Sequence, residues 1–391
     1  MVRLLGTVAL LLMFTPLCVA QKGDPEDKIT VTKTDHEHEH GDAHDSEHDD
    51  DRANIDVAIL LDTSNSMDGL ISQAKSQLWT IVQTFARTKK NGQLPKLRVS
   101  IFEYGNSNLP ATEDYIRQVL PLSDDLDKVS EALFALTTSG GDEYCGAVIA
   151  ASVKRLDWSS DDGAYKAIFI AGNEPFDQGG VDYREACGRS IGSGIVVNTI
   201  HCGDHSVGVN THWADGARIG EGKSLNIDQD VSTVTIKCPQ DERLIELNIK
   251  LNSTYLWYGD KREREELAQN QAAQDNNYSR MGTSALAGRG AAKANGLYRF
   301  KGRELVDSFG TGGINADALE EVDEEALPEE MQSMTSDQRV EHLKSKAAQR
   351  ESIKQEILAL TAEREKFLAA ERTKQGDAAE MTFGAALITA I

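Results

Sequence analysis

The sequence predicts an α/β fold, in which a doubly wound and mostly parallel sheet is followed by a mainly helical C-terminal region. Between residues 53 and about 235, short apolar runs of β type alternate with segments of helical periodicity, as expected of a parallel sheet with helices on both faces. Beyond 235 the composition becomes polar and helix-prone. The first apolar run, 55–61, ends abruptly in Asp62, and doubly wound sheets bind their ligands at such strand ends.

Each element of the sheet domain, 53–235, has its own signal. The predicted strands are 55–61, 97–103, 115–121, 165–171, 195–201 and, more weakly, 223–227. Helices are predicted between them at 124–136, 144–156, 182–191 and 211–219. After the first strand, apolar residues recur every three or four positions from Ile71 to Phe85, which predicts a helix with one buried face.

The C-terminal region, 236–391, is predicted to be helical with one interruption. Leucines from 244 to 251 and the charged segment 262–275 indicate helices, and the glycine-rich stretch 282–313 is expected to break them. Thr335 and Gln338 have the spacing of a capping box, so a long charged helix is predicted from there to Gln375. Arg364 interrupts its apolar stripe, which favours packing on other helices over a long coiled coil. Residues 381–391 predict a second short helix.

The first 52 residues have no globular pattern. Residues 1–20 have the charged start, apolar run and small-residue end of a signal peptide, which predicts a secreted or periplasmic protein. Residues 21–52 are acidic and rich in histidine, and they are predicted to be disordered. Their five histidines, 36, 38, 40, 44 and 48, either collect transition metals weakly or belong to an acidic spacer.

Charge and hydropathy exclude some partners. The chain has 41 Lys and Arg against 63 Asp and Glu, a formal net charge of −22, so it should repel nucleic acid and anionic membranes. Beyond the signal peptide, no stretch approaches the roughly 20 apolar residues of a membrane span. The cysteines after residue 20 include no C-x-x-C pair, which argues against a thiolate zinc site.

Asp62, Ser64 and Ser66 form the pattern D-x-S-x-S directly after the first strand. One carboxylate and two hydroxyls offer only oxygen donors, which suit Mg²⁺, Mn²⁺ or Ca²⁺ better than zinc or copper. The positive N-terminus of the following helix would lie beside them. The alternative is that the two serines only cap this helix.

With this motif and the strand order, residues 53–235 resemble a von Willebrand factor A (VWA) domain, which has a Rossmann-like sheet. D-x-S-x-S matches the first loop of the metal-ion-dependent adhesion site (MIDAS) of that family. The segments 138–146, 170–176 and 197–203 are similar to those of poorly characterised secreted bacterial proteins with this domain. The resemblance implies a metal whose last ligand is a carboxylate of a partner protein.

The resemblance also implies ligands from two further loops. Thr138 best matches the threonine of the second loop, with Asp142 as a possible carboxylate replacement. The third loop should supply an aspartate, but this chain has Gly172 at that position. We expect the site to be degenerate for that reason, with Asn173 or Glu174 as substitutes.

Three cysteines map to the same edge of the predicted sheet. Cys145, Cys187 and Cys202 all lie near strand ends or adjoining helix starts, and export permits disulfides. A bridge between Cys145 and Cys187 is the favoured pairing, and Cys202 could compete for either partner. Alternatively, each cysteine is a small buried residue.

The residues favour binding over catalysis. His201 and Cys202 are neighbours on a strand, so their side chains point to opposite faces, and no histidine stands in a recognisable relation to Ser64. We therefore predict an exported, non-enzymatic protein-binding module, with Mg²⁺ bridging to a partner's carboxylate. Phe176 is predicted to be an exposed aromatic that contacts the partner.

Two other functions remain open. The first is an exported metal-handling protein in which the histidine-rich segment does the work. The second is a hydrolase that uses the oxygen-donor site, which ranks below both because no general base has a plausible spacing.

Overall fold

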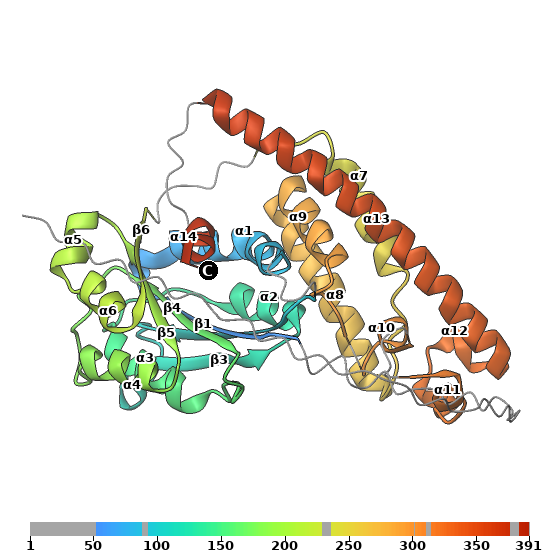
Figure 1. Cartoon of the computed structure of the whole chain (residues 1–391), viewed down its shortest axis with the longest axis horizontal. Helices are drawn as coiled ribbons and strands as arrows, with labels where there is room; N and C mark the ends of the chain where they lie inside the picture. The colour runs from blue at the N-terminus through green and yellow to red at the C-terminus, as the bar shows by residue number, and fades with distance from the viewer. Residues whose placement is uncertain are drawn as a thin grey trace, which may run out of the picture. The chain divides into compact units, whose positions relative to one another are not determined.

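The computed structural model describes residues 52–87, 93–228, 236–300, 302–309, 314–375 and 383–390 (Figure 1). The predicted signal peptide and histidine-rich segment lie outside these residues, as does the predicted domain boundary near 235. The described part of the chain falls into one compact unit. In that part, no helix is both long and apolar enough to cross a membrane.

Six strands form one sheet in the order β3-β2-β1-β4-β5-β6. The strands are β1 (Asn54–Asp62), β2 (Lys96–Tyr104), β3 (Ile116–Ser123), β4 (Tyr165–Gly172), β5 (Val196–Cys202) and β6 (Glu221–Ile227). Only the edge pair β2–β3 is antiparallel, and the other neighbours are parallel. The predicted doubly wound, mostly parallel sheet is confirmed, including its weak sixth strand.

Helices cover both faces of the sheet, as the strand pattern requires. Along β1, Val57 and Ile59 enter one core cluster and Ala58 and Leu60 the other, because successive side chains of a strand point to opposite faces. Figure 1 shows α1 and α14 on one side of the strands and α3 and α4 on the other. The helices of the sheet domain are α1 (Asp68–Phe85), α2 (Leu126–Ala135), α3 (Cys145–Arg155), α4 (Tyr183–Gly192), α5 (His205–Asn210) and α6 (Trp213–Ile219).

The C-terminal region shares the core of the sheet domain. Its helices are α7 (Asp241–Asn252), α8 (Lys261–Met281), α9 (Thr283–Ala294), α10 (Leu305–Phe309), α11 (Ala316–Glu320), α12 (Glu329–Gln332), α13 (Ser336–Gln375) and α14 (Phe383–Ala390). Leu244, Tyr278 and Ala291 belong to the same apolar cluster as Val57 and Trp79. The glycine-rich stretch departs from prediction. Helix α8 does end just before Gly282, which has a φ of 116°, but α9 begins directly after this glycine.

Arg289 of α9 ties this region to the sheet domain. Its side chain is 0% exposed, and it donates to Asp127 of α2 at 2.7 Å and to Asp275 of α8. The Asp127 carboxylate also accepts from Tyr298 at 2.6 Å. The guanidinium lies 4.8 Å from the ring centre of Trp79 in α1. A charge that is fully buried requires such partners, so α1, α2, α8 and α9 must assemble together.

The long helix α13 begins with the predicted capping box. The backbone N–H of Thr335 donates to Gln338 Oε1 at 2.9 Å, and the N–H of Gln338 donates back to Thr335 Oγ1 at 3.4 Å. Further along, Arg364 donates to Asp241 of α7 at 2.7 Å. As predicted, this arginine marks a packing contact with another helix.

The last helix, α14, packs on α1 and β6. Phe383 and Leu387 are buried in the core. At the N-terminus of the helix, the N–H of Phe383 donates to Gln73 Oε1 at 2.9 Å, and the N–H of Gly384 donates to Gln77 Oε1. These two glutamines of α1 therefore satisfy donors that every helix start leaves open.

We expect Arg289→Met to lower the free energy of unfolding by about 3–5 kcal/mol, because it leaves buried Asp127 without its cation and Asp275 with Lys293 alone. Urea unfolding followed by circular dichroism measures the loss. Arg243→Met is the matched control, since Arg243 joins α7 to α13 through an exposed ion pair with Glu356 and should leave stability nearly unchanged. Equal effects of the two variants would contradict the role given to Arg289.

Asp275 should make stability depend on acid pH. Burial acts to raise its pKa, but the charges of Lys293 and Arg289 lower it to about 2. The ionised carboxylate therefore stabilises the folded chain above pH of about 4, the unfolded value, and this contribution is lost as the pH falls toward 2. In urea unfolding, Asp275→Asn should differ less from the wild type at pH 2.5 than at pH 5. If the two proteins differ in stability by the same amount at both pH values, Asp275 is not the source of the pH dependence.

Candidate metal and partner-binding site

Asp62, Ser64 and Ser66 converge at the carboxyl end of β1. The backbone N–H of Ser64 donates to Asp62 Oδ1 at 2.8 Å, and the hydroxyls of Ser64 and Ser66 are 3.1 Å apart. Ser64 precedes a short 3₁₀ turn, Asn65–Met67, but its side chain makes no capping hydrogen bond there. Met67, not a serine, precedes α1. The two hydroxyls are therefore not engaged as helix caps.

The second oxygen of Asp62 is the unusual atom of the site. Oδ2 is buried and has no hydrogen-bond partner. Burial raises the pKa of Asp62 to about 7 against hydrogen bonds from Ser64 and Asn173, and the charge of Glu174 raises it further. A buried, unpartnered carboxylate oxygen is costly unless a cation or a proton compensates it.

Glu143 is a second carboxylate at this site, and the sequence did not single it out. Its side chain is buried, and a β-carbon on Gly105 would lie 2.6 Å from Glu143 Cγ and 3.0 Å from Asp62 Oδ1. Gly105 has a φ of 76°, so its missing side chain both permits the turn and leaves room for the two acids. Burial, followed by the charges of Asp62 and Glu174, raises the pKa of Glu143 to about 7.

The two residues predicted from the second loop point elsewhere. Ser139 N–H donates to the carbonyl of Thr63 at 3.0 Å, so this loop does lie against the first one. The hydroxyl of Thr138, however, donates to Asp68. Asp142 is exposed and accepts from the hydroxyl of Tyr144 at 3.3 Å. The loop thus presents Glu143 to Asp62 in the place expected for Asp142, one residue away.

The structure explains why position 172 in the third loop is a glycine. A β-carbon there would lie 2.5 Å from the hydroxyl of Tyr104 and 3.1 Å from Asp62 Oδ2. Tyr104 is fully buried, and its hydroxyl donates to the carbonyl of Ala171 at 3.0 Å. The phenol of Tyr104 therefore occupies the space that an aspartate side chain at 172 would need.

The predicted substitutes lie close to the serines. Asn173 Nδ2 donates to the hydroxyl of Ser66 at 3.1 Å. The Glu174 carboxylate accepts from Gln178 at 3.3 Å, and its charge acts on both Asp62 and Glu143. Asn173 is thus in direct contact with the first loop, whereas Glu174 acts on it through charge.

The prediction that Phe176 is exposed was wrong. Its side chain is 0% exposed, and its ring centre lies 4.8 Å from that of Trp213 and 5.3 Å from that of Tyr183. The absence of a side chain on Gly216 leaves room for the ring. Phe176 belongs to the core beneath the strand-end loops, because α4 and α6 fold over it.

The predicted Cys145–Cys187 disulfide is not formed. Cys145, Cys187, Cys202 and Cys238 are all free and buried. The thiol of Cys145 instead donates to the hydroxyl of Tyr104 at 3.8 Å. The alternative, that each cysteine fills a small buried position, describes the structure.

These residues fit a hard cation in part. The unpartnered Asp62 Oδ2 and the hydroxyls of Ser64 and Ser66 are oxygen donors of the right kind, and Glu143 adds negative charge. In the part of the chain that the structure describes, no group of three or more His, Cys, Asp or Glu side chains is placed to hold a metal. A cation here would therefore depend on the hydroxyls and on ligands from outside the chain.

Residues 56–212 match the family model of the von Willebrand factor type A domain. This match confirms the predicted resemblance of the sheet domain to a VWA domain. Domains of this class are typically interaction modules, and many bind a divalent metal at a MIDAS.

No protein with a curated description matches the chain. It is similar in structure to BatB, a conserved hypothetical protein from Bacteroides thetaiotaomicron, with 15% identity, 57% of this chain and 100% of that chain covered, and a TM-score of 0.34. It is also similar to the VWA domain of SpRpn10, with 16% identity, 46% and 91% covered, and a TM-score of 0.36. A third is proximal thread matrix protein 1 from the mussel byssus with zinc in its MIDAS, with 15% identity, 46% and 43% covered, and a TM-score of 0.34.

Truncating Phe176 should now cost folding stability. We expect Phe176→Ala to lower the free energy of unfolding by about 3–5 kcal/mol, because it leaves a cavity between Trp213 and Tyr183. Val209→Ala serves as the control, since Val209 is 48% exposed and should tolerate truncation. Chemical unfolding of both variants decides the matter, and an unchanged midpoint for Phe176→Ala would show that the ring is not part of the core.

Proposed function

We propose that this protein is an exported, non-enzymatic binding protein whose VWA domain recognises a protein partner at the carboxyl edge of its sheet. A divalent cation, Mg²⁺ or a similar hard ion, is held there by Asp62, Ser64 and Ser66, with Glu143 beside them. The family match to residues 56–212 supports the interaction role. The signal-like residues 1–20 support export.

The buried, unpartnered Asp62 Oδ2 carries this proposal. In a purely structural strand end, such an oxygen would be hydrogen-bonded or absent. The same strand end carries the hydroxyls of Ser64 and Ser66, 3.1 Å apart, and they do not cap a helix. A cation compensates the buried charge and uses the hydroxyls as further oxygen donors.

This chain differs from the family pattern in how charge is placed around the cation. The second loop contributes the acid Glu143, while the hydroxyl of Thr138 is engaged by Asp68. The third loop contributes no side chain at 172, and Asn173 contacts Ser66 instead. When bound, the metal supplies a positive charge. A carboxylate of the partner can then complete the set of ligands around it. The protein's own residues orient the hydroxyls and exclude water from Asp62.

A cation at this site should stabilise the folded chain. At millimolar Mg²⁺, we expect the melting temperature of the wild type to rise by about 2 °C or more, since a ligand that binds only the folded state stabilises it. Asp62→Asn should abolish this rise, because the amide offers no negative charge. It should not lower stability without metal, because it removes a buried unpaired charge. Differential scanning fluorimetry with and without chelator measures both effects.

Asp142→Asn is the matched control, because the structure places this exposed carboxylate on Tyr144. It should keep the full response to Mg²⁺. Capture of partners from an envelope or extracellular fraction should then require Mg²⁺ and fail with Asp62→Asn. If none of Mg²⁺, Mn²⁺ and Ca²⁺ raises the melting temperature of the wild type, the metal site is refuted.

A further inference from the structure

A cavity of about 530 Å³ opens near the amino ends of β1 and β2, whereas the candidate metal site lies at their carboxyl ends. Its walls come from several parts of the chain. Arg52, Lys96 and Arg98 lie at the start of the two strands, Trp158 belongs to the connection between α3 and β4, and Arg299 belongs to the connection between α9 and α10. A cavity of this size fits a small organic ligand.

Three cations gather around the start of β2. Arg52 donates from Nε to the carbonyl of Leu94 at 2.8 Å and from Nη2 to the carbonyl of Pro95 at 2.7 Å. Lys96 directly follows these residues. A β-carbon placed on Gly296 would contact both Leu94 and Arg299, with Arg299 Nη2 3.2 Å away, so Arg299 reaches the same place from the C-terminal region.

Two of the cations that line the cavity, Lys96 and Arg299, are not neutralised by the protein. Among the residues that the structure describes, neither the Lys96 ammonium nor the Arg299 guanidinium has a hydrogen-bond or ion-pair partner, and both side chains are half-buried. Arg98 differs, because it is paired with the buried Asp56 at 2.8 Å. In a chain of net charge −22, two unpaired cations that line one cavity favour an anionic ligand.

The lining also limits which anion fits. Asp124, Asp157 and Asp161 also line the cavity and are exposed, so the cavity carries negative as well as positive charge. These carboxylates repel a dianionic phosphate more than a single carboxylate, and they attract an ammonium group. Trp158 and Leu297 add apolar surface for the body of a ligand.

We propose that this cavity binds the C-terminal carboxylate of a short peptide. The carboxylate lies against Lys96 and Arg299, the peptide body lies against Trp158, and a free amino group faces the exposed aspartates. Arg299 offers paired N–H donors that match a carboxylate. Because the ligand contacts both β2 and the α9–α10 connection, its binding links the sheet domain to the C-terminal region.

Isothermal titration calorimetry of the whole protein in the presence of chelator tests this binding. The probes are trialanine, trialanine amide, N-acetyl-trialanine and inorganic phosphate. We expect trialanine to saturate one site, the amide to bind at least tenfold more weakly, and the acetylated peptide to bind less tightly than trialanine but better than the amide. Equal binding of trialanine and its amide would overturn the proposal, as would phosphate that binds more tightly than trialanine.

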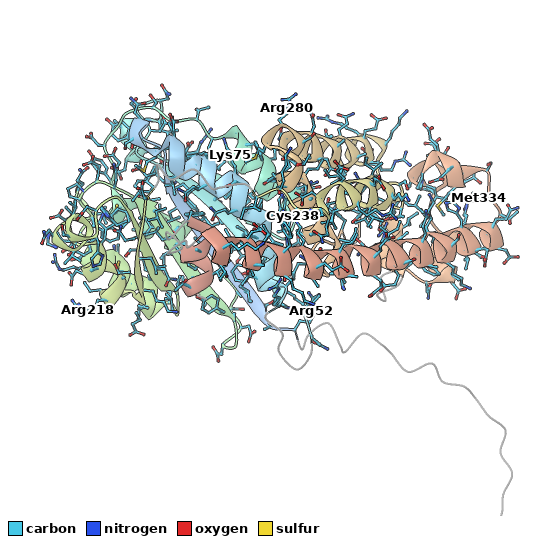
Figure 2. The ribbon with its side chains drawn as sticks, turned by 90° about the horizontal axis from the view of Figure 1, so that it is seen from above. Arg52, Lys75, Arg218, Cys238, Arg280 and Met334 are labelled. Carbon is cyan, nitrogen blue, oxygen red and sulfur yellow. The ribbon has the colours of Figure 1, made fainter. Side chains whose placement is uncertain are left out.

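Variants then locate the site. Lys96→Gln and Arg299→Gln should each weaken trialanine binding at least tenfold. Arg280→Gln is the control, because Arg280 is an exposed cation of α8 that Figure 2 shows well away from Arg52. Unchanged binding in both cavity variants would refute the assignment. The comparison of peptides on the wild type needs no variant, and Asp62→Asn should bind trialanine normally, so this proposal can fail independently of the metal site.

Discussion

The buried guanidinium of Arg289 is the constraint that holds the two parts of this protein together. Its carboxylate partners come from α2 of the sheet domain and from α8 of the C-terminal region, and Trp79 of α1 covers it. Removing the guanidinium would leave the buried carboxylate of Asp127 without its cation, which is more costly than the pair. The helices after residue 236 are therefore part of the same packed structure as the sheet that carries the candidate metal site.

Much of the fold could be predicted from the sequence, because the signals are periodic. Runs such as 55–61 and 165–171 are apolar on both faces, as central parallel strands must be, and the capping box of Thr335 and Gln338 located the start of a 40-residue helix. The glycines of 282–313 were misleading because their composition resembles a linker, whereas Ala287, Ala291 and Ala292 bury one face of α9. Tertiary packing outweighed the local preference there.

The site was predictable only where a motif fixes geometry within a few residues. D-x-S-x-S located Asp62, Ser64 and Ser66, since all three follow one strand end. In the second loop, whether Asp142 or Glu143 faces inward depends on loop backbone geometry that has no periodic signal. The predictions of an exposed Phe176 and of a disulfide were wrong for another reason. The sequence does not show whether a strand end is exposed or covered, and here α4 and α6 cover Phe176. Gly172 showed that a ligand was missing, but only the structure identifies Tyr104 as its cause.

The position of α14 has a consequence for how this chain matures. Phe383 docks on Gln73, a partner 310 residues earlier in the sequence, and Leu387 completes the core beside α1. Contacts of such long range form slowly, because the ends of a very large loop must meet first. During synthesis from the N-terminus, this side of α1 thus stays open until residues 383–390 have been made. If the chain is exported unfolded, the sheet domain is completed only after α14 has crossed the membrane. Every intermediate before that point exposes apolar surface that favours aggregation.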